Sequence, residues 1–370
     1  MKFIIKKTIL LNHLNYVSRA ISTKNIIPVL SGIKFDLTKK GLFLEASDEN
    51  IIINTLLPKD KIESILEEGK IIIPGKYILE IIRKIPNELI NFETDGQKIL
   101  ITTESSEYTL NGMNYEDFPT YNFEFNKEPI LINSKIIESI VNQVAFSTSL
   151  QESRPILTGI NFKLEKDKLE VVATDSYRLS LKTFKLENKG KETYDFVLPK
   201  TSLLELVKII DSKKEIETHI FNNKIIFKFD NILFQSKLLV GTFPNINSLI
   251  PTETPIEIKA DLDNLYNLID RTSLLSDSEK NIIQLEINNN ELIATCETVQ
   301  IGKVEERLLI ENKTNKNLKI SFNAKYMLEA LKSFEKKNIM IKFVSEIKQF
   351  IIQEENNEEL IQLIVPVRTY

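Results

Sequence analysis

Three segments of the chain carry the same helical pattern of apolar and polar positions. Residues 75–85, 200–210 and 323–334 each place apolar side chains at the spacing i, i+3, i+4, i+7, which forms one stripe of an amphipathic helix. The stripes consist of Ile78, Ile81, Ile82 and Ile85, then Leu203, Leu206, Val207 and Ile210, then Met327, Ala330, Leu331 and Phe334. A Leu-Glu pair follows the first residue of each stripe, and a basic residue lies on the opposite face. The sequence therefore predicts three related helices at intervals of about 125 residues.

Other elements recur at the same interval. An opening helix is predicted over 8–21, 133–146 and 261–275, and a β-like run precedes each second helix at 70–73, 196–198 and 318–322. Apolar runs joined by short polar turns predict hairpins at 33–37 with 42–46, 160–164 with 169–173, and 282–287 with 292–295. We predict an α+β protein of three tandem copies, each with two helices and an antiparallel sheet, whose sheets could continue from copy to copy.

Proline-bearing stretches separate the copies. The pairs Phe118-Pro119 and Phe243-Pro244 lie 125 residues apart, and the stretches 119–129 and 251–255 are typical of linkers. We place the predicted domains at 1–125, 126–252 and 253–370.

Composition narrows the class of protein. Apolar residues make up 42% and charged residues 27%, as in ordinary globular proteins, and no run approaches the ~20 apolar residues of a membrane span. The single cysteine, Cys296, excludes an intramolecular disulfide and is predicted to be a buried core residue. We expect a cytoplasmic protein without a membrane partner. The net charge of −4 excludes a uniformly basic protein, but the six predicted helices carry net positive charge, so one face can be basic.

The sequence contains no complete catalytic motif, and we do not expect an enzyme. His13 and His219 occupy non-equivalent positions, and two His and one Cys make no metal site, so neither metal nor cofactor is expected. Residues 69–76 resemble a phosphate-binding loop, but the spacing is one residue too long and Tyr77 stands where a Ser or Thr is needed. The densest polar cluster, at 174–179, is either a turn between strands, echoed at 47–50, or a hydrolytic site that uses Asp175, Tyr177 and Arg178.

At these residues the chain resembles the bacterial DNA polymerase III β subunit family, the sliding clamps. The resemblance covers the whole chain. It rests on the three copies, on Thr174-Asp175 followed by Arg178-Leu179, on Phe243-Pro244, on Phe322-Asn323 with Tyr326, and on Val365-Pro366-Val367-Arg368. It implies a head-to-tail homodimer that forms a six-unit ring around double-stranded DNA without sequence specificity. It also implies three kinds of protein partner: the catalytic subunit of DNA polymerase III, a clamp loader, and other clamp-motif clients in replication and repair.

The resemblance further implies a pocket for client peptides between the second and third copies. Carried over by motif, its wall consists of Leu157, Thr174, Ser176, Tyr177, Arg178, Leu179, Pro244, Leu249, Asn323, Tyr326, Ile347, Val365, Pro366, Val367 and Arg368. Apolar walls with a few polar groups that fix orientation suit such a pocket. Ser176-Tyr177 replaces the Gly-His that is more usual in the family.

The resemblance also implies DNA contacts and a subunit interface. Lys24, Gln151 and Lys200 are expected to touch phosphate or sugar, and Tyr108 and Leu110 are expected to meet Leu274 and Leu275 of the partner. Two other hypotheses remain open at this point. One is a repeat scaffold that binds partner peptides without forming a ring, and the other is the hydrolase described above.

Overall fold

The computed structural model contains all six predicted helices. It describes residues 1–370 except 22–26, 87, 124, 126–127, 187–191, 212–213, 278–279, 299–300 and 369–370. The helices are α1 (Lys7–Val17), α2 (Gly75–Lys84), α3 (Ser134–Gln143), α4 (Lys200–Val207), α5 (Leu262–Ser273) and α6 (Ala324–Leu331). Two helices per copy confirm the repeat. The chain divides into two compact units, residues 1–134 with 202–238, and residues 135–201 with 239–370.

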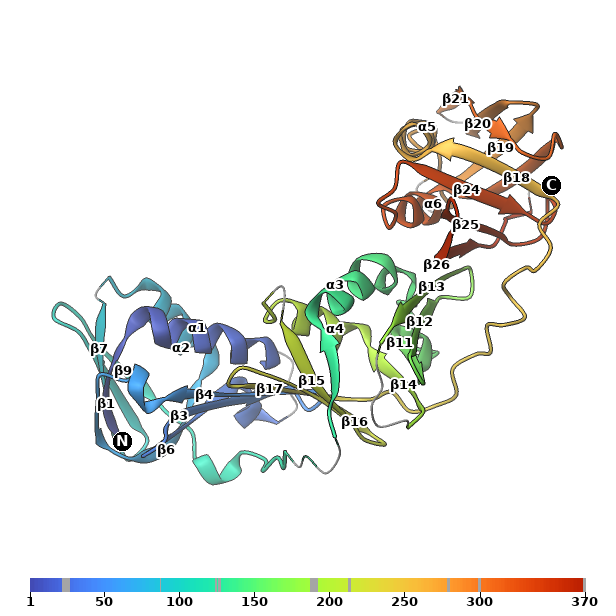
Figure 1. Cartoon of the computed structure of the whole chain (residues 1–370). Helices are drawn as coiled ribbons and strands as arrows, with labels where there is room; N and C mark the ends of the chain where they lie inside the picture. The colour runs from blue at the N-terminus through green and yellow to red at the C-terminus, as the bar shows by residue number, and fades with distance from the viewer. Residues whose placement is uncertain are drawn as a thin grey trace. The chain divides into compact units, whose positions relative to one another are not determined.

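The first unit holds two antiparallel sheets. The five-stranded sheet β5-β1-β7-β8-β9 comprises β1 (Lys2–Lys6), β5 (Ser64–Glu67), β7 (Leu89–Asp95), β8 (Lys98–Thr102) and β9 (Glu107–Asn111). The eight-stranded sheet β10-β15-β16-β17-β4-β3-β2-β6 comprises β2 (Gly32–Thr38), β3 (Gly41–Ser47), β4 (Ile51–Pro58), β6 (Gly69–Pro74), β10 (Ile130–Asn133), β15 (Glu215–Ile220), β16 (Lys224–Phe229) and β17 (Ile232–Lys237). Helix α1 packs on β3 and β4 and against α2 (Figure 1).

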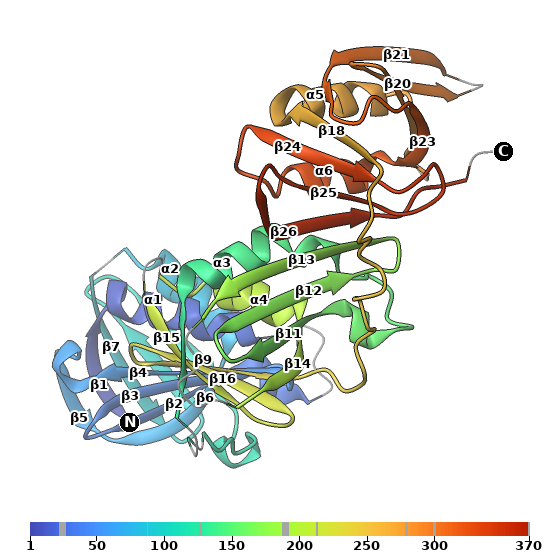
Figure 2. The ribbon, with the colours of Figure 1, turned by 45° about the vertical axis from the view of Figure 1, so that its right-hand side comes forward.

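The second unit is built in the same way. Its nine-stranded sheet β14-β11-β12-β13-β26-β25-β24-β18-β22 comprises β11 (Gly159–Glu165), β12 (Lys168–Thr174), β13 (Arg178–Lys185), β14 (Tyr194–Pro199), β18 (Ile256–Asp261), β22 (Glu311–Asn312), β24 (Asn338–Phe343), β25 (Phe350–Glu354) and β26 (Asn357–Ile364). Its four-stranded sheet β21-β20-β19-β23 comprises β19 (Ile282–Asn288), β20 (Glu291–Thr298), β21 (Gly302–Leu309) and β23 (Leu318–Asn323). Helix α5 lies between β18 and the hairpin β20–β21 (Figure 2).

Strand pairs join successive copies of the repeat. In the first unit, β4 of the first copy pairs with β17 of the central copy, with Ile52 opposite Gln235. In the second unit, β13 of the central copy pairs with β26 of the last copy, with Leu179 opposite Leu363. Continuous sheets satisfy the backbone groups that an isolated copy would leave at a sheet edge.

Aromatic side chains from both sheets pack against one another in each unit. In the first unit the Phe92 ring lies 5.1 Å from Phe3 and 5.7 Å from Phe35, centre to centre. In the second unit Phe350 lies 5.4 Å from Phe322 and 5.1 Å from Phe343. Each set ties one sheet to the other, because its rings come from strands of both.

Three features singled out in the sequence can be located in this core. Cys296 is buried, as predicted, and burial raises the pKa of its thiol. His13 lies on α1, and its Nδ1 is 2.9 Å from Oγ1 of Thr55, which is a structural role. The phosphate-loop-like segment is strand β6 followed by α2. A Cβ on Gly75 would lie 3.1 Å from the carbonyl oxygen of Ser31, so chain and not open space surrounds that glycine.

Candidate functional site

A tight turn links β12 to β13 and sets the geometry of the predicted peptide site. Oγ1 of Thr174 accepts a hydrogen bond from Ser176 N (3.1 Å) and donates one to Arg178 O (2.7 Å). Oδ1 of Asp175 accepts from the backbone N–H groups of Tyr177 (2.9 Å) and Arg178 (3.0 Å). Ser176 has a φ of +79°. The cluster is therefore an Asx turn, which leaves the Tyr177 ring exposed.

The Arg178 side chain is buried at the base of this turn. Its Nε donates to Oδ2 of Asp175 (3.0 Å), its Nη2 donates to Phe146 O (2.8 Å), and its Nη1 pairs with the carboxylate of Glu329 on α6. The guanidinium carbon also lies 4.4 Å from the centre of the Tyr326 ring. These contacts engage both Asp175 and Arg178 in the fold, so the pair has the character of a structural ion pair and not of a hydrolytic site.

The end of the chain runs beside the turn. Because the first residue of β13, Arg178, pairs with the last residue of β26, Ile364, the residues that follow β26 run past the start of β13 and beside the turn. Val365 N donates to Tyr177 O (2.9 Å), and Val367 N donates to Ser321 O (2.8 Å). The predicted wall residues at the C-terminus are thus held by backbone hydrogen bonds next to Tyr177.

The segment after Phe243 covers the same sheet. Ile246 packs in a cluster with Leu179 and Leu363, and Nε2 of Gln349 donates to Leu249 O (2.9 Å). This bond brings the Leu249 backbone to the β24–β25 turn that carries Ile347. Large exposed apolar side chains therefore come from four parts of the chain: Tyr177 (61%), Leu249 (40%), Ile347 (58%) and Val365 (38%).

The other predicted wall residues differ in accessibility. Leu157, Thr174, Arg178 and Leu179 are buried and form the framework of the site, whereas Ser176, Pro244 and Arg368 are exposed. Pro366, Val367 and Tyr326 are half-buried, and Asn323 caps α6 through a bond from Tyr326 N (3.1 Å). The wall predicted by motif lacks Phe146, Ile246, Glu329 and Gln349. Glu329 belongs to the Leu-Glu pair repeated on the three helices, so the repeat already carried a signal for it.

The comparisons with known proteins cover the chain from end to end. Residues 1–122, 131–245 and 247–368 match the N-terminal, central and C-terminal domains of the DNA polymerase III beta subunit. The chain is also 35% identical to the beta sliding clamp of Bacillus subtilis over 378 residues, which is 100% of both chains. The chain belongs to the DNA polymerase III beta subunit family.

Further relatives agree with this assignment. The beta sliding clamp of Staphylococcus epidermidis is 34% identical over 377 residues, again with 100% of both chains covered. Among solved structures, the sliding clamp of Bacillus subtilis matches with a TM-score of 0.96 at 34% identity, and the beta chain of Streptococcus pneumoniae with 0.94 at 33%. Both matches cover 100% of both chains. As a member of the beta sliding clamps, the protein is a processivity factor and not an enzyme.

The residues predicted to contact DNA differ in how exposed they are. Gln151 is exposed in the loop before β11, where its N–H donates to Oγ of Ser149 (3.0 Å). Lys200 is the first residue of α4 and is half-buried; burial and then the nearby Arg178 charge lower its pKa. Lys24 falls outside the described residues.

The predicted interface residues of the beta subunit lie at or near sheet edges. Tyr108 and Leu110 belong to β9, the edge strand of the five-stranded sheet. Leu274 follows α5 and is 75% exposed, and Leu275 is half-buried. On β21, which is also an edge strand, Glu306 accepts two bonds from Arg271 (3.0 and 2.8 Å).

The described part of the chain offers neither a metal site nor a membrane-spanning helix. It contains no group of three or more His, Cys, Asp or Glu side chains that could hold a metal ion. Over the same residues, no helix is long and apolar enough to span a membrane.

Proposed function

We propose that this protein works as a DNA sliding clamp in which two chains, arranged head to tail, close a ring around duplex DNA. The observation that carries the proposal is the full-length match of three consecutive domains to beta sliding clamps. We place the boundaries of the three domains near residues 125 and 252 and the protein in the cytoplasm. The ring tethers the catalytic subunit of DNA polymerase III to its template, and a separate loader opens it.

The charge distribution favours DNA along the helices. Within their bounds the six helices contain eight basic and six acidic residues, a net charge of +2, so the rest of the chain carries −6. The surplus is uneven, because α2 carries +2 and α5 carries −1. Lys and Arg without base-reading contacts bind any DNA sequence through its phosphates. We assign phosphate or sugar contacts to Lys24, Gln151 and Lys200.

The exposed apolar side chains of the second unit form the client-peptide site. Tyr177, Leu249, Ile347 and Val365 offer apolar surface, and the buried Arg178 network holds the turn from which Tyr177 projects. A partner peptide with Leu and Phe side chains matches this chemistry. Clients in replication and repair would compete for it.

Two open strand edges and an exposed leucine support the subunit interface. We propose that β9, with Tyr108 and Leu110, meets β21 of the partner, and that Leu274 and Leu275 seal the seam. Among the described residues neither β9 nor β21 has a second strand neighbour. Glu305 and Glu306 already pair with Arg307 and Arg271 of their own chain, which reduces their repulsion toward Glu104 and Glu107 of the other chain.

Retention on DNA tests the proposal. The labelled protein is loaded with a clamp loader and ATP onto nicked circular DNA, and the DNA is then linearised. We expect retention on the circle and loss from the linear form, because a ring slides off a free end. Equal retention on both forms would indicate ordinary electrostatic binding. Retention on neither would favour a scaffold that binds peptides without forming a ring.

A further inference from the structure

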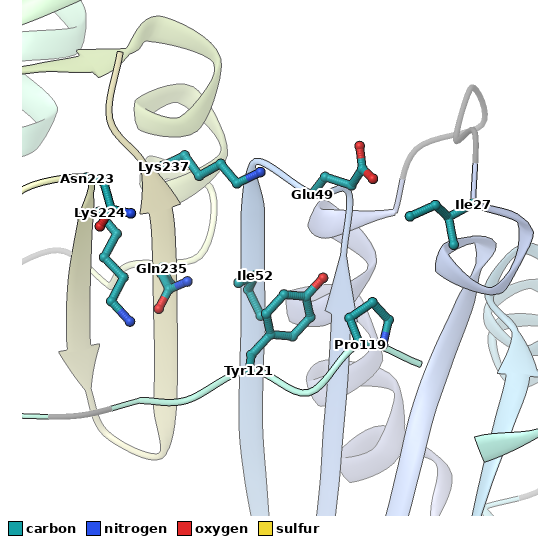
Figure 3. Close-up of a pocket in the computed structure, with 9 residues that line it drawn as sticks. All are labelled: Ile27, Glu49, Ile52, Pro119, Tyr121, Asn223, Lys224, Gln235 and Lys237. Carbon is teal, nitrogen blue, oxygen red and sulfur yellow. The ribbon is translucent and has the colours of Figure 1, made fainter. Parts of the chain in front are cut away.

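A pocket of about 340 Å³ lies in the first unit, whereas the candidate peptide site belongs to the second. It opens on the face of strands β4 and β17 that the chain segment after Phe118 crosses (Figure 3). Ile27, Ile52, Pro119 and Tyr121 form its apolar wall. The Tyr121 hydroxyl donates a hydrogen bond to Oγ of Ser47 (2.9 Å), which holds the ring at the end of β3.

One wall residue has a buried oxygen for which the described part of the chain offers no hydrogen-bond partner. Gln235 is only 7% exposed, and its Oε1 accepts no hydrogen bond from any residue that the structure describes. It lies opposite Ile52 in the β4–β17 pair, so both side chains face the pocket. A buried acceptor without a partner is costly, and a ligand N–H in the pocket would remove that cost. After rotation the same amide can instead donate to a carbonyl, so a peptide bond satisfies it either way.

Two lysines and one glutamate distribute charge unevenly around the pocket. Lys224 and Lys237 come from the paired strands β16 and β17, and Nζ of Lys224 donates to Asn122 O (3.1 Å) in the covering segment. Lys237 is exposed. Glu49 lines the pocket from the β3–β4 turn. An anionic group is therefore favoured on the β16–β17 side and disfavoured beside Glu49.

The pocket repeats the backbone geometry of the candidate peptide site. Glu49 N donates to Oγ of Ser47 (3.1 Å), as Ser176 N donates to Thr174, and Glu49 has a φ of +74° where Ser176 has +79°. Oδ1 of Asp48 accepts hydrogen bonds from the backbone N–H groups of Asn50 and Ile51. Oδ1 of Asp175 accepts bonds from the residues at the same positions of its own turn.

The neighbouring strands repeat as well. Lys237 N donates to Asn50 O (2.8 Å), just as Val365 N donates to Tyr177 O (2.9 Å). Ile52 opposite Gln235 corresponds to Leu179 opposite Leu363. Two apolar residues of the candidate peptide site, Leu363 and Val365, are thus replaced by an amide and an ammonium group.

We propose that this pocket is a second peptide site, which binds a short acidic segment of a partner protein. An apolar side chain of the segment packs on Ile52 and Tyr121, its backbone amide bonds to Gln235, and its carboxylate lies at Lys237. The repeated backbone frame favours an extended peptide, and the amide and lysine favour a more polar, more acidic one than the first site takes. The inference stands on the geometry of the first unit and not on the proposed clamp activity.

Fluorine NMR of the full-length protein labelled with 3-fluorotyrosine tests this site. The chain has 10 tyrosines, so the signals of Tyr121 and Tyr177 can be assigned with Tyr121→Phe and Tyr177→Phe. The probe is acetyl-Glu-Leu-Phe-Asp-amide, and acetyl-Lys-Leu-Phe-Lys-amide is its charge-inverted control. We expect the acidic peptide to shift the Tyr121 signal in a saturable way. Lys237→Glu should raise its Kd at Tyr121 at least about tenfold and favour the basic peptide.

Lys39→Glu is the matched control, because it makes the same change of charge on an exposed turn of the same unit. It should leave the Kd at Tyr121 within about twofold, since an exposed charge outside the pocket is screened. A Tyr121 signal that does not move, or a Kd that Lys237→Glu leaves unchanged, would overturn the second site. The Tyr177 signal and retention on circular DNA report separately on the first site and on the clamp, so failure of either is distinguishable from failure here.

Discussion

The guanidinium carbon of Arg178 lies 4.4 Å from the centre of the Tyr326 ring, so a residue of the central copy stacks on a residue of the last copy. The same guanidinium pairs with Asp175 on its own turn and with Glu329 on α6. One buried side chain therefore shapes the turn that exposes Tyr177 and fastens it to the helix beside it. This contact holds the turn of the candidate peptide site in place.

Replacing Arg178 with Met should lower the free energy of unfolding by about 3–5 kcal/mol, because the carboxylates of Asp175 and Glu329 lose their shared partner. Denaturant unfolding measures the change. Arg307→Met is the control, since Arg307 pairs with Glu305 at an exposed position, where a pair contributes at most about 1 kcal/mol. Equal losses in both variants would contradict the role of Arg178.

Deleting residues 365–370 should abolish binding of a Leu- and Phe-rich client peptide and leave the dimer intact. The deletion removes Val365, with its exposed side chain, and the backbone bonds that Val365 and Val367 make to Tyr177 and Ser321. Fluorescence polarisation measures peptide binding, and sedimentation checks the dimer. A shorter deletion of residues 369–370 is the control and should bind normally. A 365–370 deletion that still bound peptide would place the site elsewhere.

The double variant Leu274→Ala, Leu275→Ala should weaken the dimer. Losing two leucines from a buried seam costs about 2–4 kcal/mol of association free energy, which raises Kd about 30- to 1,000-fold. Analytical ultracentrifugation over a range of concentrations measures it. Leu66→Ala, at another exposed leucine, should not change the sedimentation of the protein. Persistent dimers in the double variant would mean that the interface is formed by other residues.

Lys200→Ala should reduce the salt dependence of DNA binding. One fewer phosphate contact lowers the slope of log K against log salt by about 0.9, with the same effect on every DNA sequence. The measurement is a titration of duplex DNA at several salt concentrations. Lys316→Ala removes an exposed lysine outside the predicted DNA contacts and is the control. A slope that Lys200→Ala leaves unchanged would remove Lys200 from the interface.

His13 should make the stability of the protein depend on pH. Burial lowers the pKa of His13, so its neutral form is favoured in the fold and its charged form in the unfolded chain. The contribution of neutral His13 to the free energy of unfolding is therefore complete above about pH 6.5. It is lost as the pH falls from there toward the lower pKa that His13 has in the folded protein. His13→Gln should flatten the curve of Tm against pH in that window. Parallel curves for variant and wild type below pH 6.5 would show that other groups set the dependence.

The helices and their repeat were predictable because amphipathic spacing is a local property. The stripe from Ile78 to Ile85 needs only its own residues and an apolar partner surface, and α2 ends within one residue of the predicted bound. The turn at Asp175 was equally local, since an Asx turn forms within four residues. Strands that precede each opening helix, such as β1, were missed because charged residues flank their short apolar runs.

The candidate peptide site was only partly predictable. The motif named Arg178 and Val365, but nothing near Arg178 in the sequence indicates that Phe146 O and the Glu329 carboxylate receive its guanidinium. The buried state of Leu157 and Leu179 also depends on what packs over them. A sequence motif does not distinguish an exposed residue that lines the site from a buried residue that supports it.

The sequence by itself determined the helices, the hairpins, the threefold repeat and the family, because each of these depends on the spacing of apolar residues, turns and motifs along the chain. Only the tertiary structure decided which strand of one copy meets which strand of the next. The pairs Ile52 with Gln235 and Leu179 with Leu363 each join residues more than 180 positions apart. Those registers place the Gln235 amide in the pocket of the first unit and apolar side chains in the candidate peptide site. Pairing between distant strands is selected by the packing of whole sheet faces, which no local pattern specifies.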